Sequence, residues 1–433
     1  MTSKLFSDLI PPIAIVGMGI TGISVKNLLI VAGIAPDSIL TFDEKSTEAQ
    51  FHSGNELLQR AMPKTLIVSP GVPLKTPWIV EAQKNGIQVL SELSLASRLL
   101  TTESVIAITG SVGKSTTTCL LRAALETFCP AYFVGGNLGT PLAIYATELI
   151  ENKRPRADWI VLELSSYQLE NFPELKAEYS IITYLTANHL ERYESKQKYF
   201  EIKWNIEKHT KTALILNSNG GELKSWSQKY PPRLQYIWTD HTDPLIQKHS
   251  LFKCELLGGH NLDNIAMAAQ IIHLAQWPEK AYLGLRQFPG LSHRVENLGV
   301  HGGVRYINDS KATTMESVKI AVQSVLDSLT KSETLHLLLG GKDKNLPWQD
   351  LSSLMQYPQI QFYFFGECRV KAKNLTQLTG TTSTTMLEAL IEAKKIAKTG
   401  DAILLSPGGT SLDEFKNFEQ RGETFRNFAL NCT

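Results

Sequence analysis

Short apolar runs rich in β-branched residues recur along the chain and alternate with longer helical patterns. Examples are "VIAIT" at 105–109, "WIVLEL" at 159–164, "LHLLL" at 335–339 and "AILLS" at 402–406. Fully apolar strands that alternate with helices at this spacing are typical of parallel sheets covered by helices. This alternation constrains the fold more than any other feature, and it predicts an α/β protein.

The chain of 433 residues is too long for one compact core, so we expect several domains. Two glycine loops, one after Val16 and one after Thr109, each open a strand–loop–helix unit. A stretch with proline and glycine at 288–306 precedes a new series of strands. We predict a Rossmann-like N-terminal domain, a central P-loop ATPase-type domain with a parallel sheet, and a Rossmann-like C-terminal domain. Their predicted bounds are 1–97, 98–292 and 293–433.

Lysine and arginine number 43 against 42 for aspartate and glutamate, which argues against a nucleic-acid or membrane surface. Every apolar stretch is broken well short of the ~20 residues that a membrane span needs, and the N-terminus makes a poor signal peptide. The five cysteines include no C-x-x-C pair. We therefore expect a cytoplasmic protein with reduced thiols and with neither a nucleic-acid nor a membrane partner.

The segment "TGSVGKST" follows an apolar strand and precedes a helical pattern. Gly110 and Gly113 let backbone N–H groups turn toward an anion, and the following helix adds the positive end of its dipole. Lys114 is placed to reach nucleotide phosphates, and Ser115 or Thr116 to bind Mg²⁺. The alternative is an ordinary glycine turn, but a lysine and a serine directly after the second glycine favour a phosphate site.

A phosphate loop of this kind needs a carboxylate near the end of a neighbouring strand to help hold Mg²⁺. Glu163 lies at the end of the apolar run "WIVLEL". An acid in an apolar strand is costly unless a cation pairs with it, so we favour metal binding over a solvent-facing edge position. His189 lies in the loop after the next strand, and the residues alone leave open whether it is structural or functional.

The first glycine loop, "IAIVGMGITGIS", has the G-x-G-x-x-G spacing directly after a strand, and Asp43 ends the next strand where a ribose-binding acid belongs. Alone, this pattern is compatible with NAD(P), with another nucleotide diphosphate or with helix–sheet packing only. A dehydrogenase would have little use for the second, ATP-type loop. The two loops together favour a nucleotide-linked substrate in one domain and ATP in the next.

Three strand ends in the last third of the chain carry lysine or hydroxyl side chains: "NDSK" at 308–311, "GGKDKN" at 340–345 and "SPGGTS" at 406–411. Ligand sites in open α/β sheets lie at the carboxyl ends of the strands. We therefore expect these loops to form one site for an anionic small molecule, with solvated surface turns as the alternative.

The chain resembles the Mur ligases over essentially its full length. The resemblance rests on ordered stretches that include "GMGITG", "SPGVP", "TGSVGKST", "GGNLGTP", "LELSSYQLE", "NHLERY", "GGHNLDN", "LSHRVE", "NDSKAT", "GGKDKN" and "SPGGTSLDEFKNFEQRG". It implies a monomeric ligase of cytoplasmic peptidoglycan precursor synthesis that uses ATP and Mg²⁺. The implied substrates are UDP-N-acetylmuramoyl-L-alanine, whose carboxylate becomes an acyl phosphate, and D-glutamate, whose amine attacks it.

The resemblance also implies roles for individual residues. The implied catalytic residues are Lys114, Asn137, His189 and Lys203. The implied ligands of two Mg²⁺ ions are Ser115, Glu163, His189 and a carbamylated Lys203. The implied ATP contacts are Gly110, Ser111, Gly113, Lys114, Ser115, Thr116, Asn261, Asn264, Arg294 and Asp309. The residues alone predict a solvated helix position for Lys203, so its role comes from the resemblance only.

Two further sets of positions match substrate contacts of the family. The UDP-sugar is expected at Ile20, Thr21, Asp43, Glu44 and Gly71, with its reacting carboxylate near Asn137 and His189. D-glutamate is expected at Lys311, Thr313, Lys344, Ser411, Leu412 and Phe418. Three positions depart from the family pattern: Val112 and Thr314 each replace an asparagine, and Asn188 replaces an acid before the histidine.

Other functions compete with this interpretation. A sister ligase or a folylpolyglutamate-synthase-like ligase would add a different amino acid. The D-N-P-R motif of the diaminopimelate-adding branch is absent, while "SLDEFKNFEQRG" resembles the glutamate-adding branch. A P-loop switch or motor ATPase is the alternative from a different class, and it would need a partner surface that the sequence does not reveal.

Overall fold

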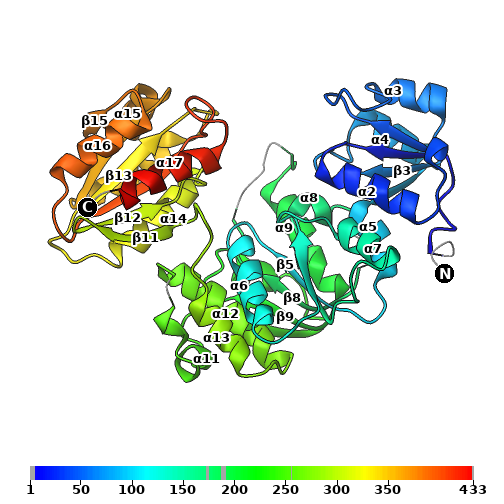
Figure 1. Ribbon diagram of the computed structural model, residues 1–433, viewed down its shortest axis with the longest axis horizontal. Coiled ribbons are helices and arrows are strands. Elements are labelled where there is room, and N and C mark those ends of the chain that lie inside the picture. The colour runs from blue at the N-terminus through cyan, green and yellow to red at the C-terminus, as the bar shows by residue number, and fades with distance from the viewer. Residues whose placement is uncertain (1–4, 172–174, 187–191, 255, 432–433) are drawn as a thin grey trace. The chain divides into compact units, whose positions relative to one another are not determined.

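The structure is a computed structural model, shown in Figure 1, and it describes residues 5–171, 175–186, 192–254 and 256–431. The chain forms two compact units. The first contains Met1–His249 and Asp263–Leu285, and the second contains Ser250–Leu262 and Arg286–Thr433. In the described parts of the chain, no helix combines the length and the apolar character that a membrane span requires.

The first unit begins with a four-stranded parallel sheet in the order β2-β1-β3-β4. Its strands are β1 (Ile13–Val16), β2 (Ile39–Phe42), β3 (Thr65–Val68) and β4 (Gln88–Ser91). The α-helices along this part of the chain are α2 (Ile20–Val31), α3 (Gly54–Glu56), α4 (Pro77–Lys84) and α5 (Glu92–Ala96). Local chemistry sets the helix starts, because Pro77 opens α4 and the Ser91 side chain caps α5.

The second sheet of this unit has six parallel strands in the order β10-β9-β8-β5-β7-β6. The strands are β5 (Ser104–Thr109), β6 (Tyr132–Gly136), β7 (Trp159–Glu163), β8 (Ala177–Ile182), β9 (Thr210–Asn217) and β10 (Gln235–Thr239). The α-helices are α6 (Lys114–Glu126), α7 (Leu142–Ile150), α8 (Ser166–Leu169), α9 (Lys196–Trp204), α10 (Leu223–Ser227), α11 (Pro244–Lys248), α12 (Gly259–Leu274) and α13 (Lys280–Gln287).

The second unit holds a six-stranded sheet in the order β11-β12-β16-β13-β14-β15. The strands are β11 (Glu296–His301), β12 (Val304–Asn308), β13 (Leu335–Gly340), β14 (Ile360–Phe365), β15 (Gly380–Thr382) and β16 (Ala402–Gly408). Its α-helices are α14 (Met315–Leu326), α15 (Arg369–Thr376), α16 (Met386–Ile396) and α17 (Phe418–Leu430). Only β11 pairs antiparallel among these described strands, because the Gly302–Gly303 turn, with φ of 57° and 78°, permits a tight hairpin.

Both faces of the central strands are buried. Ile13 and Ile15 of β1 belong to one hydrophobic cluster, whereas Ala14 and Val16 belong to another. Since successive side chains of a strand point to opposite faces, each face carries its own core. This explains the continuous apolar runs of the sequence, and the prediction of an α/β fold with parallel sheets is confirmed. The domain bounds stay predictions, each lying between the last strand of one sheet and the first of the next.

One histidine interrupts the apolar pattern of β13. His336 is 1% exposed, and its ring nitrogens lie 2.9 Å from the Tyr363 hydroxyl and 3.2 Å from an Asp401 carboxylate oxygen. Burial lowers the pKa of His336 below its ordinary 6.5, although the carboxylate opposes this effect. The folded state therefore favours the neutral imidazole.

We expect the contribution of His336 to the free energy of unfolding to decrease as the pH is lowered from about 7 to about 5, because the unfolded chain protonates His336 before the folded protein does. The buried carboxyls Glu92 and Asp309, whose pKa values are raised to about 7, act in the opposite direction, so the His336 contribution is the difference between the wild type and a His336 variant. The pKa of Asp401 is lowered from 3.8, so Asp401 titrates below this window. Urea midpoints at both pH values should fall less in H336Q than in the wild type. At pH 7 this variant should lose about 1–3 kcal/mol, because buried partners lose hydrogen bonds. An equal pH-dependent fall in both proteins would contradict the assignment.

Candidate active site

The loop between β5 and α6 has the backbone that an anion site needs. Gly110 has φ of 147° and Gly113 has φ of 88°, conformations that favour glycine. No side chain caps the first turn of α6. The positive end of the helix dipole therefore favours an anion in the loop.

Lys114 lies across the same loop. Its Nζ donates hydrogen bonds to the carbonyl oxygens of Gly110 at 2.8 Å and of Ser111 at 3.2 Å. Ser115, in the first turn of α6, is buried, and Thr116 beside it is half-buried. An ammonium group, a helix N-terminus and hydroxyl groups thus meet at one loop, which supports the predicted phosphate site.

Several side chains stabilise the phosphate loop by hydrogen bonds. The sequence analysis did not predict this role for them. Thr117 Oγ1 donates to the Gly113 carbonyl at 3.0 Å and to Asn264 Oδ1 at 3.3 Å. Ser111 Oγ donates to the Thr186 carbonyl at 2.9 Å. The contacts with Asn264 and with Thr186 join residues that are far apart in sequence, so local sequence patterns do not reveal them. Asn264, predicted as an ATP contact, lies directly against the loop.

Replacing Gly110 with alanine should weaken ATP binding at least about tenfold, because the strained backbone would displace phosphate donors. The new Cβ would lie 2.0 Å from Thr183 Oγ1 and 3.0 Å from the Tyr184 nitrogen. Titration calorimetry with Mg-ATP measures the loss. Gly259→Ala is the control, because a Cβ at Gly259 meets no atom within 4 Å. Equal ATP affinity in both variants would contradict the role of the Gly110 backbone.

Glu163 lies at the end of β7 beside the start of the phosphate loop, in register with Ile108 of β5. Its side chain is buried, and Oε1 accepts a hydrogen bond from Asn137 Nδ2 at 2.7 Å. The other carboxylate oxygen, Oε2, is buried and has no hydrogen-bond partner among the described residues. A buried carboxylate oxygen without a donor is costly unless a cation lies against it.

The surroundings of Glu163 are compatible with Mg²⁺. This ion prefers oxygen ligands and is usually held by one or two carboxylates together with substrate phosphates. Within the described ranges, no group of three or more His, Cys, Asp or Glu side chains is arranged to hold a metal. Glu163 would therefore act with the Ser115 hydroxyl and with the phosphates of a bound nucleotide.

Lys203 is buried, so the solvated position expected from the residues alone is wrong. Its side chain on α9 is 1% exposed, and Nζ donates to the Gly110 carbonyl at 2.8 Å. Burial, followed by the repulsion of Lys114, holds the pKa of Lys203 well below its ordinary 10.5. Tyr199, one helical turn earlier, is also buried, and this spacing of four residues was the available signal that Lys203 faces inward.

The first sheet contributes a cavity of about 490 Å³ to the same unit. Four of the five residues expected at the UDP-sugar line it together with Asn137; they are Ile20, Thr21, Asp43 and Gly71. Glu44 is exposed and does not line it. Asp43 Oδ2 accepts the Met18 backbone N–H at 2.8 Å, and such backbone donors lower the pKa of Asp43 below its ordinary 3.8.

Asp309 and Arg294 belong to the second unit. Asp309 is 5% exposed and accepts hydrogen bonds from Ser406 Oγ at 2.7 Å and from the Val295 nitrogen at 3.2 Å. Burial raises the pKa of Asp309 to about 7. Arg294 is exposed, and it is one of the cations that favour the ionised carboxylate of Asp309.

Hydrogen bonds connect the three loops of the second unit, and their role as one ligand site stays a prediction. Arg421, which the sequence analysis missed, is fully buried; it donates to the Ser310 carbonyl at 2.7 Å and to the Gly409 carbonyl at 3.2 Å. Lys342 and Thr410 exchange backbone hydrogen bonds of 2.8 and 2.9 Å. These contacts connect the loops at 308–311, 340–345 and 406–411.

The residues expected at D-glutamate lie on or near these loops with different exposures. The Lys311 ammonium group lies 4.7 Å from the centre of the Phe418 ring. Ser411 is buried and Thr313 is half-buried, whereas Lys344 and Leu412 are exposed. Their roles stay predictions.

Several other predicted positions are less informative. His189 and Asn188 lie outside the described residues. Asn261, on α12, donates to the Leu257 carbonyl at 2.7 Å. The Val112 carbonyl accepts a hydrogen bond from the Thr183 hydroxyl, so Val112 contacts its surroundings through its backbone. Thr314 caps α14 by accepting the backbone N–H of Ser317, which gives the residue a structural task.

Comparisons with known proteins agree with this arrangement. Residues 108–272 match the family model "Mur ligase middle domain", and residues 12–91 match "Mur ligase MurD-like, N-terminal domain". A UDP-N-acetylmuramoylalanine--D-glutamate ligase from Baumannia cicadellinicola subsp. Homalodisca coagulata is 34% identical over 96% of this chain and 96% of its own. A protein of the same name from Buchnera aphidicola subsp. Acyrthosiphon pisum (strain Tuc7) is 31% identical over 95% and 96%.

Solved structures share the fold. MurF ligase from Thermotoga maritima in complex with ADP has a TM-score of 0.59 at 14% identity and covers 91% of this chain and 96% of its own. UDP-N-acetylmuramate-alanine ligase MurC from Thermotoga maritima has a TM-score of 0.56 at 16% identity, with coverage of 97% and 99%. At these identities the likeness concerns the fold alone.

Proposed function

This chain belongs to the Mur ligase family, and on that basis we propose that it uses ATP to join D-glutamate to UDP-N-acetylmuramoyl-L-alanine in peptidoglycan precursor synthesis. Relatives named for this activity match it over nearly their full length. The names of these relatives do not favour the alternatives, which are a sister ligase, a P-loop switch ATPase and a dehydrogenase. We also propose that the chain is a cytoplasmic monomer, as its resemblance to the Mur ligases implies.

The observation that carries this proposal is the position of Asn137. Its side chain donates to Glu163, beside the start of the phosphate loop. Asn137 also lines the cavity of about 490 Å³ that Asp43 lines. A UDP-linked substrate in that cavity would therefore present its carboxylate close to the phosphate loop.

The chemistry follows from the need to activate a carboxylate. A carboxylate oxygen of the substrate attacks the γ-phosphorus of ATP, the bond to the bridging oxygen breaks, and ADP leaves. The D-glutamate amine then attacks the acyl carbon and loses a proton, and the tetrahedral intermediate expels phosphate to give the amide. Lys114 and the N–H groups of α6 would stabilise the charge of the transferring phosphoryl group. Mg²⁺, when bound, neutralises further negative charge on the phosphates.

We also propose that Lys203 is carbamylated. Only a neutral amine reacts with CO₂, and the lowered pKa of Lys203 favours that form. The reaction forms an N–C bond, releases one proton and leaves an anion. The carbamate anion would attract the Lys114 ammonium group, whose charge disfavours a protonated Lys203. The carbamate would then be a second oxygen ligand for Mg²⁺ beside Glu163.

The proposal is tested by measuring phosphate release from Mg-ATP with purified protein. Release should require both UDP-N-acetylmuramoyl-L-alanine and D-glutamate, and L-glutamate should not replace D-glutamate. Rapid release that is indifferent to both substrates would instead indicate an ATPase of another class.

A further inference from the structure

Helix α7 begins without a cap of its own. Pro141 occupies the N-cap position, no local side chain accepts a hydrogen bond there, and the first turn carries no acidic residue. The first N–H groups of a helix have no intrahelical acceptor, so a buried helix start needs acceptors from elsewhere. These N–H groups lie directly after the loop that carries Asn137.

Glu92 supplies the acceptor from a distant part of the chain. It is the first residue of α5, and its Oε1 accepts the Ala143 backbone N–H at 2.5 Å. The backbone N–H of Leu142 is also directed at this carboxylate. A carboxylate at a helix N-terminus gains from the helix dipole as well as from the hydrogen bonds.

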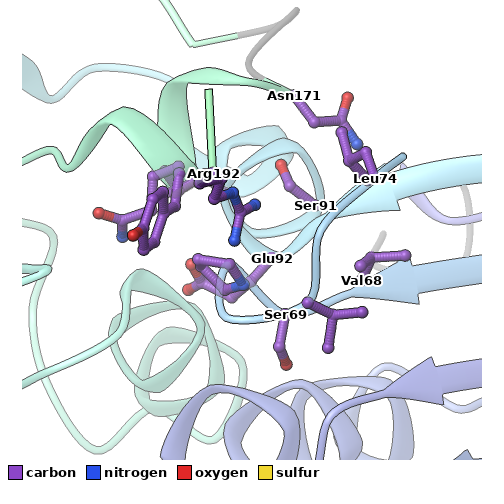
Figure 2. Close-up of a pocket in the computed structure, with 12 residues that line it drawn as sticks. Val68, Ser69, Leu74, Ser91, Glu92, Asn171 and Arg192 are labelled. Atoms are coloured by element: carbon purple, nitrogen blue, oxygen red, sulfur yellow. The ribbon is translucent and has the colours of Figure 1, made fainter. Parts of the chain in front are cut away.

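The surroundings of Glu92 make this contact hard to replace. Its side chain is 3% exposed, and it lines a small pocket of about 20 Å³ with Ser69, Ser91 and Arg192 (Figure 2). Arg192 is bound to Glu170 through two hydrogen bonds of 2.9 and 2.7 Å. Burial raises the pKa of Glu92 to about 7, and the N–H donors of α7 oppose this rise.

The start of α7 is coupled to the substrate cavity through a short loop. Gly136, Asn137, Gly139 and Pro141 all line the cavity of about 490 Å³. Within this loop, the Gly136 nitrogen donates to the Thr140 carbonyl at 2.9 Å. The first end of the loop is held by β6 and by the Asn137 backbone N–H, which donates to the Glu163 carbonyl at 2.8 Å. The other end, at Pro141, leads directly into the first turn of α7.

We propose that Glu92 is a positioning residue of the ligase: by capping α7 it holds the cavity-lining loop between β6 and α7 in the shape that orients the UDP-linked substrate. The inference rests on the function proposed above. It gives the segment after β4 a role beyond lining the cavity, because the Glu92 side chain from this segment orders the loop between β6 and α7. The described contacts of the Glu92 carboxylate go to the start of α7 and not to the phosphate loop.

The test compares Glu92→Ala, Glu92→Gln and the control Glu81→Ala, whose side chain is exposed on α4. E92A should raise KM for UDP-N-acetylmuramoyl-L-alanine and lower kcat, each about tenfold, because a misplaced contact loses substrate orientation. Its KM values for ATP and D-glutamate should stay within about twofold of the wild type, since those contacts lie elsewhere. E92Q keeps an oxygen acceptor and should recover most of the loss. E81A should match the wild type.

Hydrogen exchange separates this inference from the proposed function. In E92A the peptide that contains the start of α7 should exchange faster than in the wild type, whether or not the protein has ligase activity. An inactive wild type with this exchange pattern would refute the proposed function and the catalytic consequence, leaving only the cap. Unchanged exchange in E92A, unchanged kinetics for the UDP-linked substrate, or equal losses for all three substrates would each overturn the positioning role.

Discussion

Replacing Lys203 with alanine should lower kcat about a thousandfold while leaving the fold intact, because it would remove an anionic ligand from a metal that stabilises phosphoryl transfer. The side chain is buried against the Gly110 carbonyl, and burial and Lys114 lower the pKa of its amine. A large loss of kcat is expected because the described residues include no cluster of three metal-binding side chains around Glu163 that could replace the carbamate. Phosphate release under saturating substrates measures the effect.

Two further variants make the Lys203 result specific. Lys203→Arg keeps a cation but cannot form the lysine carbamate, so it should be as inactive as the alanine variant. Lys198→Ala removes an exposed lysine from the same helix, whose ammonium group lies 3.5 Å from Glu201, and it should retain full activity. Intact mass measured with CO₂ retained should show the added group only in the wild type and in K198A. An active K203R protein would contradict the carbamate.

Glu163→Gln should lower kcat by about a hundredfold to a thousandfold and raise the Mg²⁺ concentration needed for half-maximal rate, because the amide is a far weaker cation ligand. The exchange is nearly isosteric, and the new side-chain oxygen can still accept the Asn137 hydrogen bond. The loss therefore reports on the free carboxylate oxygen, which is buried without a described partner. Rates are measured across a Mg²⁺ titration.

Glu178→Gln is the matched control for this prediction. Glu178 lies on β8, the next strand along the chain, and is partly exposed beside Lys211. It should show a Mg²⁺ dependence like that of the wild type. If E163Q also titrated with Mg²⁺ like the wild type, Glu163 would not be a metal ligand, and its orphan oxygen would need another explanation.

Much of the central site could be predicted because its signals are local. A strand, two glycines and a lysine specify the phosphate loop, and the rule that ligands bind at the carboxyl ends of parallel strands identifies Glu163. The register of β5 and β7 then brings the two together. The parallel sheets follow equally directly from runs of apolar residues that are buried on both faces.

The rest depends on contacts between distant segments. The links from Thr117 to Asn264, from Arg421 to Gly409 and from Glu92 to Ala143 join positions that no local pattern relates. The burial of Lys203 was missed for a related reason, since a lysine on a short polar helix is usually solvated. Here the aromatic residue one turn earlier directs that face of α9 inward.

The central claim, that the chain activates a carboxylate by phosphorylating it, is tested most directly by isotope transfer. UDP-N-acetylmuramoyl-L-alanine is labelled with a heavy oxygen isotope in its terminal carboxylate and incubated with Mg-ATP, D-glutamate and the protein. The released phosphate should carry one labelled oxygen for each amide formed, because that oxygen leaves with the phosphoryl group. Amide formation with unlabelled phosphate would contradict the acyl phosphate and the mechanism built on it.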